Sequence, residues 1–164
     1  MDPSQHKSGW ALVTGASAGI GAEFCRQLAG RGYSLLLVAR RWDRLEQLAD
    51  ELRQQHAVDC RVLPLDLAQQ GAARAIETTL AEAGIEIEFL VNNAGYGVPG
   101  TFTESDWQVH QDSLNVMLKS VAELTWRLLP GMQARRRGFV VNVASLAGLV
   151  PSSARHTLYG ATKA

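Results

Sequence analysis

The chain has 164 residues, with 16 lysine and arginine residues against 16 aspartate and glutamate residues, so its formal net charge is zero. This length suffices for one domain with a hydrophobic core. The balanced charge gives no general attraction to nucleic acid or to an anionic membrane, and every apolar run is far too short to span a bilayer. We therefore expect a soluble, cytoplasmic protein that has neither nucleic acid nor a membrane as a partner.

Apolar, strand-like runs alternate with amphipathic helical stretches along the chain. Strands are expected at residues 10–14, 33–40, 59–65, 87–91 and 139–144. Helices are expected at residues 19–30, 43–55, 69–83 and 105–129. A further helix is expected to have scarcely begun when the chain ends. This alternation is typical of βαβ units, in which helices cover both faces of a parallel sheet. We therefore predict an α/β fold, a doubly wound, Rossmann-like parallel sheet with strand order 3-2-1-4-5.

Apolar residues recur at helical spacing in the predicted helices, and we expect them to face the core. They are Ile20, Phe24 and Leu28; Leu45, Leu48 and Leu52; Ala73, Ile76 and Leu80; and Leu114, Met117, Val121, Leu124 and Leu128. Ser105 and Gln108 have the spacing of a capping box at the start of the longest helix. Cys25 and Cys60 lack a C-x-x-C partner, so we expect buried free thiols. The histidines and cysteines lack metal-ligand spacing, so no metal site is predicted.

The turn between the first strand and the first helix is rich in glycine. Residues 14–21 read TGASAGIG. Gly15 permits a sharp turn, Gly19 lets a phosphate approach the backbone, and Gly21 allows the helix to pack closely. The N–H groups at the start of the helix and its positive dipole end favour a pyrophosphate. We interpret the turn as a dinucleotide site; the alternative is a glycine-rich turn that holds no ligand.

The residues at the end of the second strand distinguish between two dinucleotides. An acidic side chain there binds the ribose 2′-hydroxyl of NAD, whereas an arginine accommodates the 2′-phosphate of NADP. The sequence at this place is Ala39-Arg40-Arg41, without an acid. NADP is therefore the predicted cofactor, with NAD as the alternative, and Arg40 is the expected phosphate ligand. For Arg41, the alternative to binding the phosphate is that its side chain is an ordinary charge in contact with solvent.

Tyr159 and Lys163 lie in the sequence YGATK at the end of the chain. In a helix this spacing puts both side chains on one face, about 5–6 Å apart. The pKa of a free tyrosine is about 10, and a neighbouring ammonium lowers it because it favours the phenolate. A phenol tuned in this way can protonate the alkoxide that forms when a carbonyl is reduced. The alternative is an ordinary surface pair.

Several motifs, in this order, resemble those of the short-chain dehydrogenase/reductase family in its compact single-domain branch. They are the TGxxxGIG turn, Leu65-Asp66-Leu67 after the third strand, Asn92-Asn93-Ala94-Gly95 after the fourth, Asn115 in the long helix, Ser145 after the fifth strand, and YxxxK at 159–163. The resemblance extends from about residue 9 to the end. It implies an incomplete NAD(P)-binding Rossmann domain at residues 9–164, preceded by a flexible tail at residues 1–8.

The resemblance also implies roles for individual residues. Those implied in catalysis are Asn115, Ser145, Tyr159 and Lys163. Those implied in cofactor binding are Gly15, Ser17, Gly19, Ile20, Gly21, Arg40, Asp66, Leu67, Asn93, Ala94, Gly95, Tyr159 and Lys163. Ser145 would bind the substrate oxygen; considered on its own, it could instead be a helix cap. Asn115 would hold a water that links Lys163 to solvent. Ala18 stands where members that prefer NADP often have a basic residue.

The function predicted is that of an NADP-dependent oxidoreductase, which transfers a hydride between the nicotinamide and a small-molecule carbonyl or secondary alcohol. The alternatives are a non-catalytic dinucleotide-binding module and an inactive fragment of such an enzyme. Compared with the family, the part of the fold after the YxxxK helix is missing, so we expect this chain alone to be poorly active. Family members commonly form homo-oligomers through their long helix and the YxxxK helix. Residues 96–102 are the candidate wall of a substrate site.

Overall fold

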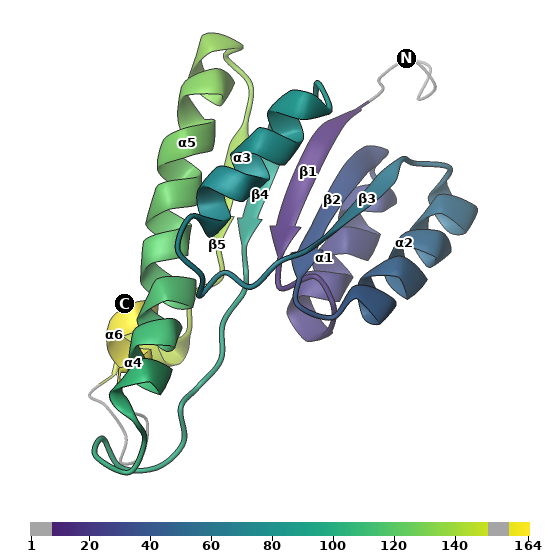
Figure 1. The fold of residues 1–164 in the computed structure, drawn as a ribbon. Coiled ribbons are helices and arrows are strands. Elements are labelled where there is room, and N and C mark those ends of the chain that lie inside the picture. The colour runs from purple at the N-terminus through teal and green to yellow at the C-terminus, as the bar shows by residue number, and fades with distance from the viewer. Residues whose placement is uncertain (1–7, 151–157) are drawn as a thin grey trace.

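A computed structural model of the chain describes residues 8–150 and 158–164, and its centre is a five-stranded sheet. The strands are β1 (Ser8–Thr14), β2 (Tyr33–Ala39), β3 (Cys60–Pro64), β4 (Ile87–Asn92) and β5 (Phe139–Asn142). Neighbouring strands are parallel, and their order across the sheet is β3-β2-β1-β4-β5. The predicted doubly wound, Rossmann-like sheet is confirmed (Figure 1).

Helices cover both faces of the sheet and enclose two hydrophobic cores (Figure 1). The helices on the sheet are α1 (Gly19–Ala29), α2 (Trp42–His56), α3 (Ala72–Glu82) and α5 (Ser120–Ala134), whereas α4 (Trp107–Leu114) and the short α6 (Tyr159–Lys163) lie beyond the ends of the strands. In β1, Ala11 and Val13 join the core of α1 and α2, whereas Leu12 joins the core of α3 and α5. Because successive strand residues point to opposite faces, a strand that serves both cores is apolar at consecutive positions.

An end of β1 and an end of β5 each differ from the predicted one by two residues, and the ends of the other strands differ by at most one residue. β1 begins at Ser8, which pairs with Tyr33 of β2, so Ser8 belongs to the sheet and not to the predicted tail. The rest of that tail, residues 1–7, lies outside the described residues. β5 ends at Asn142, before Val143 and Ala144, which the prediction had included in the strand. The chain thus leaves the sheet shortly before Ser145.

The stripe predicted for α1 is buried only in part: Leu28 is buried and Phe24 is half-buried against the core, and small residues make up the rest of the buried face. Gly21, Ala22, Cys25, Leu28 and Ala29 are buried, whereas Ile20 is 61% exposed. Small side chains let the helix approach the sheet closely. The stripes of α2 and α3 are buried as predicted, at Leu45, Leu48, Leu52, Ala73, Ile76 and Leu80. Cys25 and Cys60 are buried free thiols, which confirms that prediction.

The helix predicted at residues 105–129 has other ends and an interruption. It begins at Trp107 after Asp106, and the Gln108 side chain donates to Asp112, so the capping-box prediction is wrong. A turn closed by a hydrogen bond from the Thr101 N–H to the Glu104 carboxylate precedes the helix and delays its start. The π-helix η2 (Asn115–Lys119) separates α4 from α5. α5 then continues to Ala134, past the predicted end at residue 129, and contains Pro130.

The outer face of this long helical segment carries exposed apolar side chains. They belong to Trp107, Val109, Leu118, Trp126 and Leu129. On the inner face, Met117 and Leu124 are buried as predicted, and Leu114, Val121 and Leu128 are half-buried. Within residues 8–150 and 158–164, none of the helices combines the length and the apolar character needed to cross a membrane.

Candidate active site

A cavity of about 650 Å³ lies at the carboxyl ends of the strands, and each of the five strands leads into residues that line it. The lining residues are Gly15, Ser17, Ala18, Ile20, Ala39, Arg40, Arg41, Leu65, Asp66, Leu67, Asn93, Ala94, Gly95, Tyr96, Val116, Val143, Ala144, Ser145, Tyr159 and Lys163. The volume is within the range of about 300–1,000 Å³ that small-molecule sites have. Its place, outside the strand ends where the strand order reverses, is the ligand site of open α/β sheets.

The glycine turn forms one wall of the cavity. Gly15 has a φ of 67°, in the left-handed region that favours glycine. A Cβ at Gly21 would overlap the Gly15 carbonyl oxygen, so the close helix packing predicted for Gly21 is present. Ala18, the N-cap of α1, makes no side-chain capping bond, which leaves the first-turn N–H groups for a ligand. Gly19 and Gly21 support the turn without lining the cavity.

Asn93 connects the loop after β4 to the glycine turn through hydrogen bonds. Its Nδ2 donates to the carbonyl oxygens of Thr14 at 2.9 Å and of Gly15 at 3.3 Å. The Thr14 hydroxyl accepts from the Asn93 N–H at 3.0 Å and from the Ala94 N–H at 3.1 Å. These bonds join the carboxyl ends of β1 and β4, so Asn93 both lines the cavity and steadies the adjacent strands.

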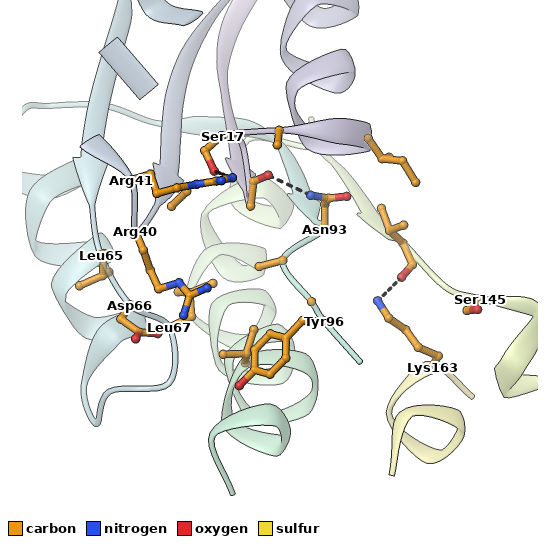
Figure 2. A pocket seen from close by; sticks show the side chains of 18 of the residues that line it. Ser17, Arg40, Arg41, Leu65, Asp66, Leu67, Asn93, Tyr96, Ser145 and Lys163 are labelled. Atoms are coloured by element: carbon orange, nitrogen blue, oxygen red, sulfur yellow. Dashed lines mark hydrogen bonds between the residues drawn. The ribbon is translucent and has the colours of Figure 1, made fainter. Parts of the chain in front are cut away.

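Two arginines follow β2 at the cavity wall (Figure 2). The Arg41 Nη2 donates to the Ser17 hydroxyl at 3.0 Å, which ties this guanidinium to the glycine turn. Arg40 lies nearer to Asp66 and Leu67, which follow β3. The Asp66 carboxylate accepts from the Ala68 N–H at 3.0 Å and so fixes its own loop. The ends of β2 and β3 thus place both cationic and anionic side chains at this part of the cavity.

Ser145, Tyr159 and Lys163 line another part of the cavity, and they come from the segment after β5 and from α6. The Lys163 Nζ donates to the Val143 carbonyl oxygen at 2.8 Å (Figure 2). Burial lowers the pKa of Lys163 from its ordinary value. The Ser145 Oγ accepts from the Ala147 N–H at 3.2 Å and caps the short 3₁₀-helix η3 (Leu146–Gly148). A phenol, an ammonium and a hydroxyl therefore share one wall.

Asn115 is the predicted site residue whose side chain the structure does not bring to the cavity. Its Nδ2 donates to the Ala68 carbonyl oxygen at 3.1 Å, and the residue borders a separate, small hollow beside Lys119. Asn115 begins the π-helix η2, where the wider turn puts the next residue, Val116, at the cavity wall. The side chain of Asn115 therefore bridges η2 to the loop after β3.

Some lining residues were not among the predicted binding residues. Four of them lie next to predicted residues in the sequence or within two positions of one, and this closeness could have indicated them. They are Arg41, Leu65, Val143 and Ala144. Val116 gave no signal, because its position depends on the π-helix. Tyr96, from the candidate substrate wall, lines the cavity, and burial raises its pKa. The ring of Phe102, from the same predicted wall, packs at a tilt against the ring of His110, with ring centroids 4.8 Å apart.

A doubly wound parallel sheet, with a glycine turn after its first strand and a cavity at the reversal of strand order, is the architecture of dinucleotide-binding proteins. A family model described as short chain dehydrogenase matches residues 9–164. The chain belongs to the short-chain dehydrogenase family. Members of this family are oxidoreductases that bind NAD(P) and act on small-molecule carbonyl or alcohol compounds.

Curated relatives include proteins named as very-long-chain 3-oxoacyl-CoA reductases. The chain is 37% identical over 159 residues to a very-long-chain 3-oxoacyl-CoA reductase-like protein of Arabidopsis thaliana. It is 35% identical over 158 residues to the very-long-chain 3-oxoacyl-CoA reductase of Homo sapiens. Each match covers 94% of this chain and 50% of the relative, so the chain spans about half the length of the curated relatives it matches.

Solved structures of the family have the same fold. The bulky-bulky ketone specific alcohol dehydrogenase of Comamonas testosteroni matches with a TM-score of 0.89 and 35% identity, over 96% of this chain and 63% of that chain. A short-chain dehydrogenase of Sphingobium yanoikuyae in complex with NADPH matches with a TM-score of 0.87 and 33% identity, over 95% of this chain and 60% of that chain.

Proposed function

We propose that the protein is an NADP-dependent oxidoreductase that transfers a hydride between the nicotinamide and the carbon of a carbonyl or secondary alcohol, with Tyr159 as general acid and base. The observation that carries this proposal is the composition of the cavity wall. The glycine turn and two arginines lie in the same cavity as Ser145, Tyr159 and Lys163. The volume of the cavity and the uncapped N-terminus of α1 fit a dinucleotide.

Arg40 and Arg41 favour NADP over NAD. Both line the cavity directly after β2, and the sequence Ala39-Arg40-Arg41 holds no acid that would bind a free 2′-hydroxyl. Guanidinium groups bind phosphate through charge-assisted, often paired hydrogen bonds. The Ser17 hydroxyl accepts from Arg41 and so keeps its guanidinium beside the turn proposed to hold the pyrophosphate. The NADPH complex of the Sphingobium relative supports the same cofactor for this chain.

The residues of the chain account for the proton that carbonyl reduction requires. When bound, the nicotinamide supplies the hydride. Ser145 accepts from Ala147, so its hydroxyl can donate its own hydrogen to the substrate oxygen and orient it. Tyr159 gives its phenolic proton to that oxygen as negative charge develops there, and takes it back in the reverse reaction. The Lys163 ammonium, held by the Val143 carbonyl, stabilises the phenolate.

The relatives suggest the substrates to test first. The Arabidopsis and human relatives are named for the reduction of 3-oxoacyl-CoA, and the Comamonas enzyme for bulky ketones. In both, a carbonyl group adjoins a large organic substituent. We therefore propose a 3-oxoacyl thioester and a bulky ketone as the first two substrates for this chain.

The test is the variant Tyr159→Phe, assayed by the loss of NADPH absorbance with these two substrates. Removing the proton donor is expected to lower kcat by about 10²–10⁴-fold, while NADPH binding stays unchanged. Tyr33→Phe is the matched control, because Tyr33 packs its ring against Phe89 outside the cavity lining. That control is expected to keep the wild-type rate.

The outcomes separate the candidate functions. If wild type and Tyr159→Phe turn over at equal rates, the role of Tyr159 is refuted. If the wild type binds NADPH and reduces neither substrate, enzymatic activity of this chain on these substrates is refuted, which favours the two alternatives, a dinucleotide-binding module and an inactive fragment of such an enzyme. If the wild type does not bind NADPH, the cofactor part of the proposal is refuted as well.

A further inference from the structure

The segment between β4 and α4, residues 93–106, forms neither helix nor strand, and we call it the β4–α4 loop. It extends beyond the ends of the strands before it returns to α4 (Figure 1). Irregular segments of this length in a compact domain usually carry function. Asn93 bonds the start of the loop to the glycine turn, and Tyr96 lines the cavity. The position of Tyr96 therefore also depends on what holds the far part of the loop.

His110 of α4 holds that far part through a ring nitrogen. Its Nε2 lies 2.9 Å from the Phe102 carbonyl oxygen. Because a carbonyl oxygen can only accept, Nε2 carries the proton and donates it. The His110 ring also packs at a tilt against the rings of Phe102 and Trp107, with centroids 4.8 Å and 6.3 Å apart. His110 is only 2% exposed, so this contact is shielded from water.

The other ring nitrogen of His110 is buried without a partner. In the part of the chain that the structure describes, its Nδ1 makes no hydrogen bond. A buried polar atom that lacks a partner lowers stability. A phenyl ring would fill the same space without that loss, so packing alone does not account for a histidine here. The hydrogen bond from Nε2 to Phe102 does account for it.

The β4–α4 loop also lies close to the α4 segment at Tyr96. The charge of Asp112, two residues after His110, adds to the effect of burial in raising the pKa of Tyr96, which puts this carboxylate near the phenol. Val116, at the end of the same helical segment, lines the cavity together with Tyr96. One segment therefore carries the donor to Phe102, a charge near Tyr96 and a residue of the cavity wall.

We infer that His110 is a positioning residue, whose Nε2–H holds the β4–α4 loop on α4 so that Tyr96 lies in the cavity wall before a ligand binds. Holding a loop in its bound position improves affinity, because the loop does not have to be ordered during binding. His110 is not among the lining residues of the cavity, so its effect reaches a ligand through the loop. The inference rests on the proposed function, since that function makes the ligand a dinucleotide.

The test compares the variants His110→Phe and His110→Gln. Phenylalanine keeps a ring and removes the donor, whereas glutamine supplies an amide donor. In the free protein, hydrogen exchange followed by mass spectrometry should be faster at residues 97–104 in His110→Phe and close to wild type in His110→Gln. NADPH should bind about twofold to tenfold more weakly to His110→Phe, which corresponds to the loss of one hydrogen bond, and normally to His110→Gln.

Two further measurements separate positioning from a general effect on stability. The melting temperature of His110→Phe should stay at the wild-type value, because removal of the unpaired Nδ1 offsets the lost bond. In the wild type, ¹⁵N NMR of the neutral ring should locate its proton on Nε2, a result that needs no variant. His56→Phe is the matched control, since His56 is exposed at the end of α2 outside the cavity lining. It should keep wild-type exchange and NADPH binding.

The inference is overturned if the ring proton of the wild type lies on Nδ1. It is also overturned if loop exchange or NADPH affinity is equal in wild type and His110→Phe, or if both His110 variants lose melting temperature and affinity in parallel. A wild type that binds no NADPH refutes the proposed function instead. Hydrogen exchange in the free protein and the position of the ring proton then still decide whether His110 holds the loop.

Discussion

Gly21 determines how closely α1 approaches the turn after β1. A Cβ at this position would overlap the Gly15 carbonyl oxygen and lie 2.5 Å from the Asn93 Nδ2. That Nδ2 itself donates to the carbonyl oxygens of Thr14 and Gly15. One residue without a side chain thus lets the turn, the helix and the loop after β4 meet at the wall of the cavity.

The variant Gly21→Ala is therefore expected to lose stability. An extra methyl group in a filled space costs about 1–3 kcal/mol, and each kcal/mol lowers the melting temperature of a domain of this size by about 2–4 °C. Thermal unfolding followed by circular dichroism measures the change, and NADPH binding should weaken with it.

Gly30→Ala is the matched control for this prediction. Gly30 has a φ of −60°, and the nearest atom to a Cβ there would be 3.4 Å away, so alanine fits. The control is expected to melt at or slightly above the wild-type temperature, because alanine restricts the unfolded chain more than glycine does. A Gly21→Ala protein that melts together with the wild type would contradict the packing described for α1.

Most residues of the site could be predicted because they follow buried strands in recognisable motifs. The glycine turn, Arg40, Asp66 and Asn93 are examples, and all of them lie at the cavity. Val116 could not be predicted, because its orientation depends on how the helix is wound around it. The placement of Asn115 also depends on that winding, since its amide bonds the Ala68 carbonyl instead of entering the cavity.

At the scale of elements, α1 and β3 each contribute a thiol to the core beneath α1 and α2. Cys25 lies in α1 and Cys60 begins β3. Burial raises the pKa of Cys60 to about 11, with Arg53 partly opposing the shift. Burial also raises the pKa of Cys25, and the charge of Cys60 adds to that effect. Both thiols therefore stay protonated near neutral pH.

This shift predicts a loss of stability in alkaline solution. Because the pKa of Cys60 is higher in the folded chain than the reference value of 9.0, the folded chain holds this proton more tightly than the unfolded chain. The stabilisation is complete below pH 9.0 and is lost as the pH rises towards about 11. Urea unfolding of wild type and Cys60→Ala at about pH 8 and about pH 10.5 measures it, and the variant should lose less stability. Equal losses in both proteins would contradict the assignment.

The elements themselves were predictable to different degrees. The strands and their order could be predicted, because a sheet covered on both faces requires consecutive apolar residues such as Leu35, Leu36 and Leu37 of β2. The face of α1 was predictable only in part, because Leu28 is buried as expected, whereas Ile20 is exposed and the small residue Ala22 is buried. Helix ends also escaped prediction where a local turn delayed the start or where the helix continued past a proline.

At the scale of the whole molecule, the cavity is formed by residues of the sheet and of the helices on both of its faces. The turn before α1, the loops after β2, β3 and β4, the π-helix η2 and α6 all contribute to its wall. The chain that builds this wall spans about half the length of its curated relatives. The proposed function of this chain therefore depends on one property, the ability of the cavity to hold a phosphorylated dinucleotide.

A fluorescence titration of the chain with NADPH and with NADH tests this property most directly. A charge-assisted hydrogen bond contributes about 1.5–3 kcal/mol, so we predict that NADPH binds at least about tenfold more tightly than NADH. The double variant Arg40→Ser, Arg41→Ser should lose this preference and keep its NADH affinity. Arg44→Ser is the control, since Arg44 lies in α2 outside the cavity lining. Failure of the wild-type chain to bind either dinucleotide, or a preference for NADPH that survives in the double variant, would contradict the account.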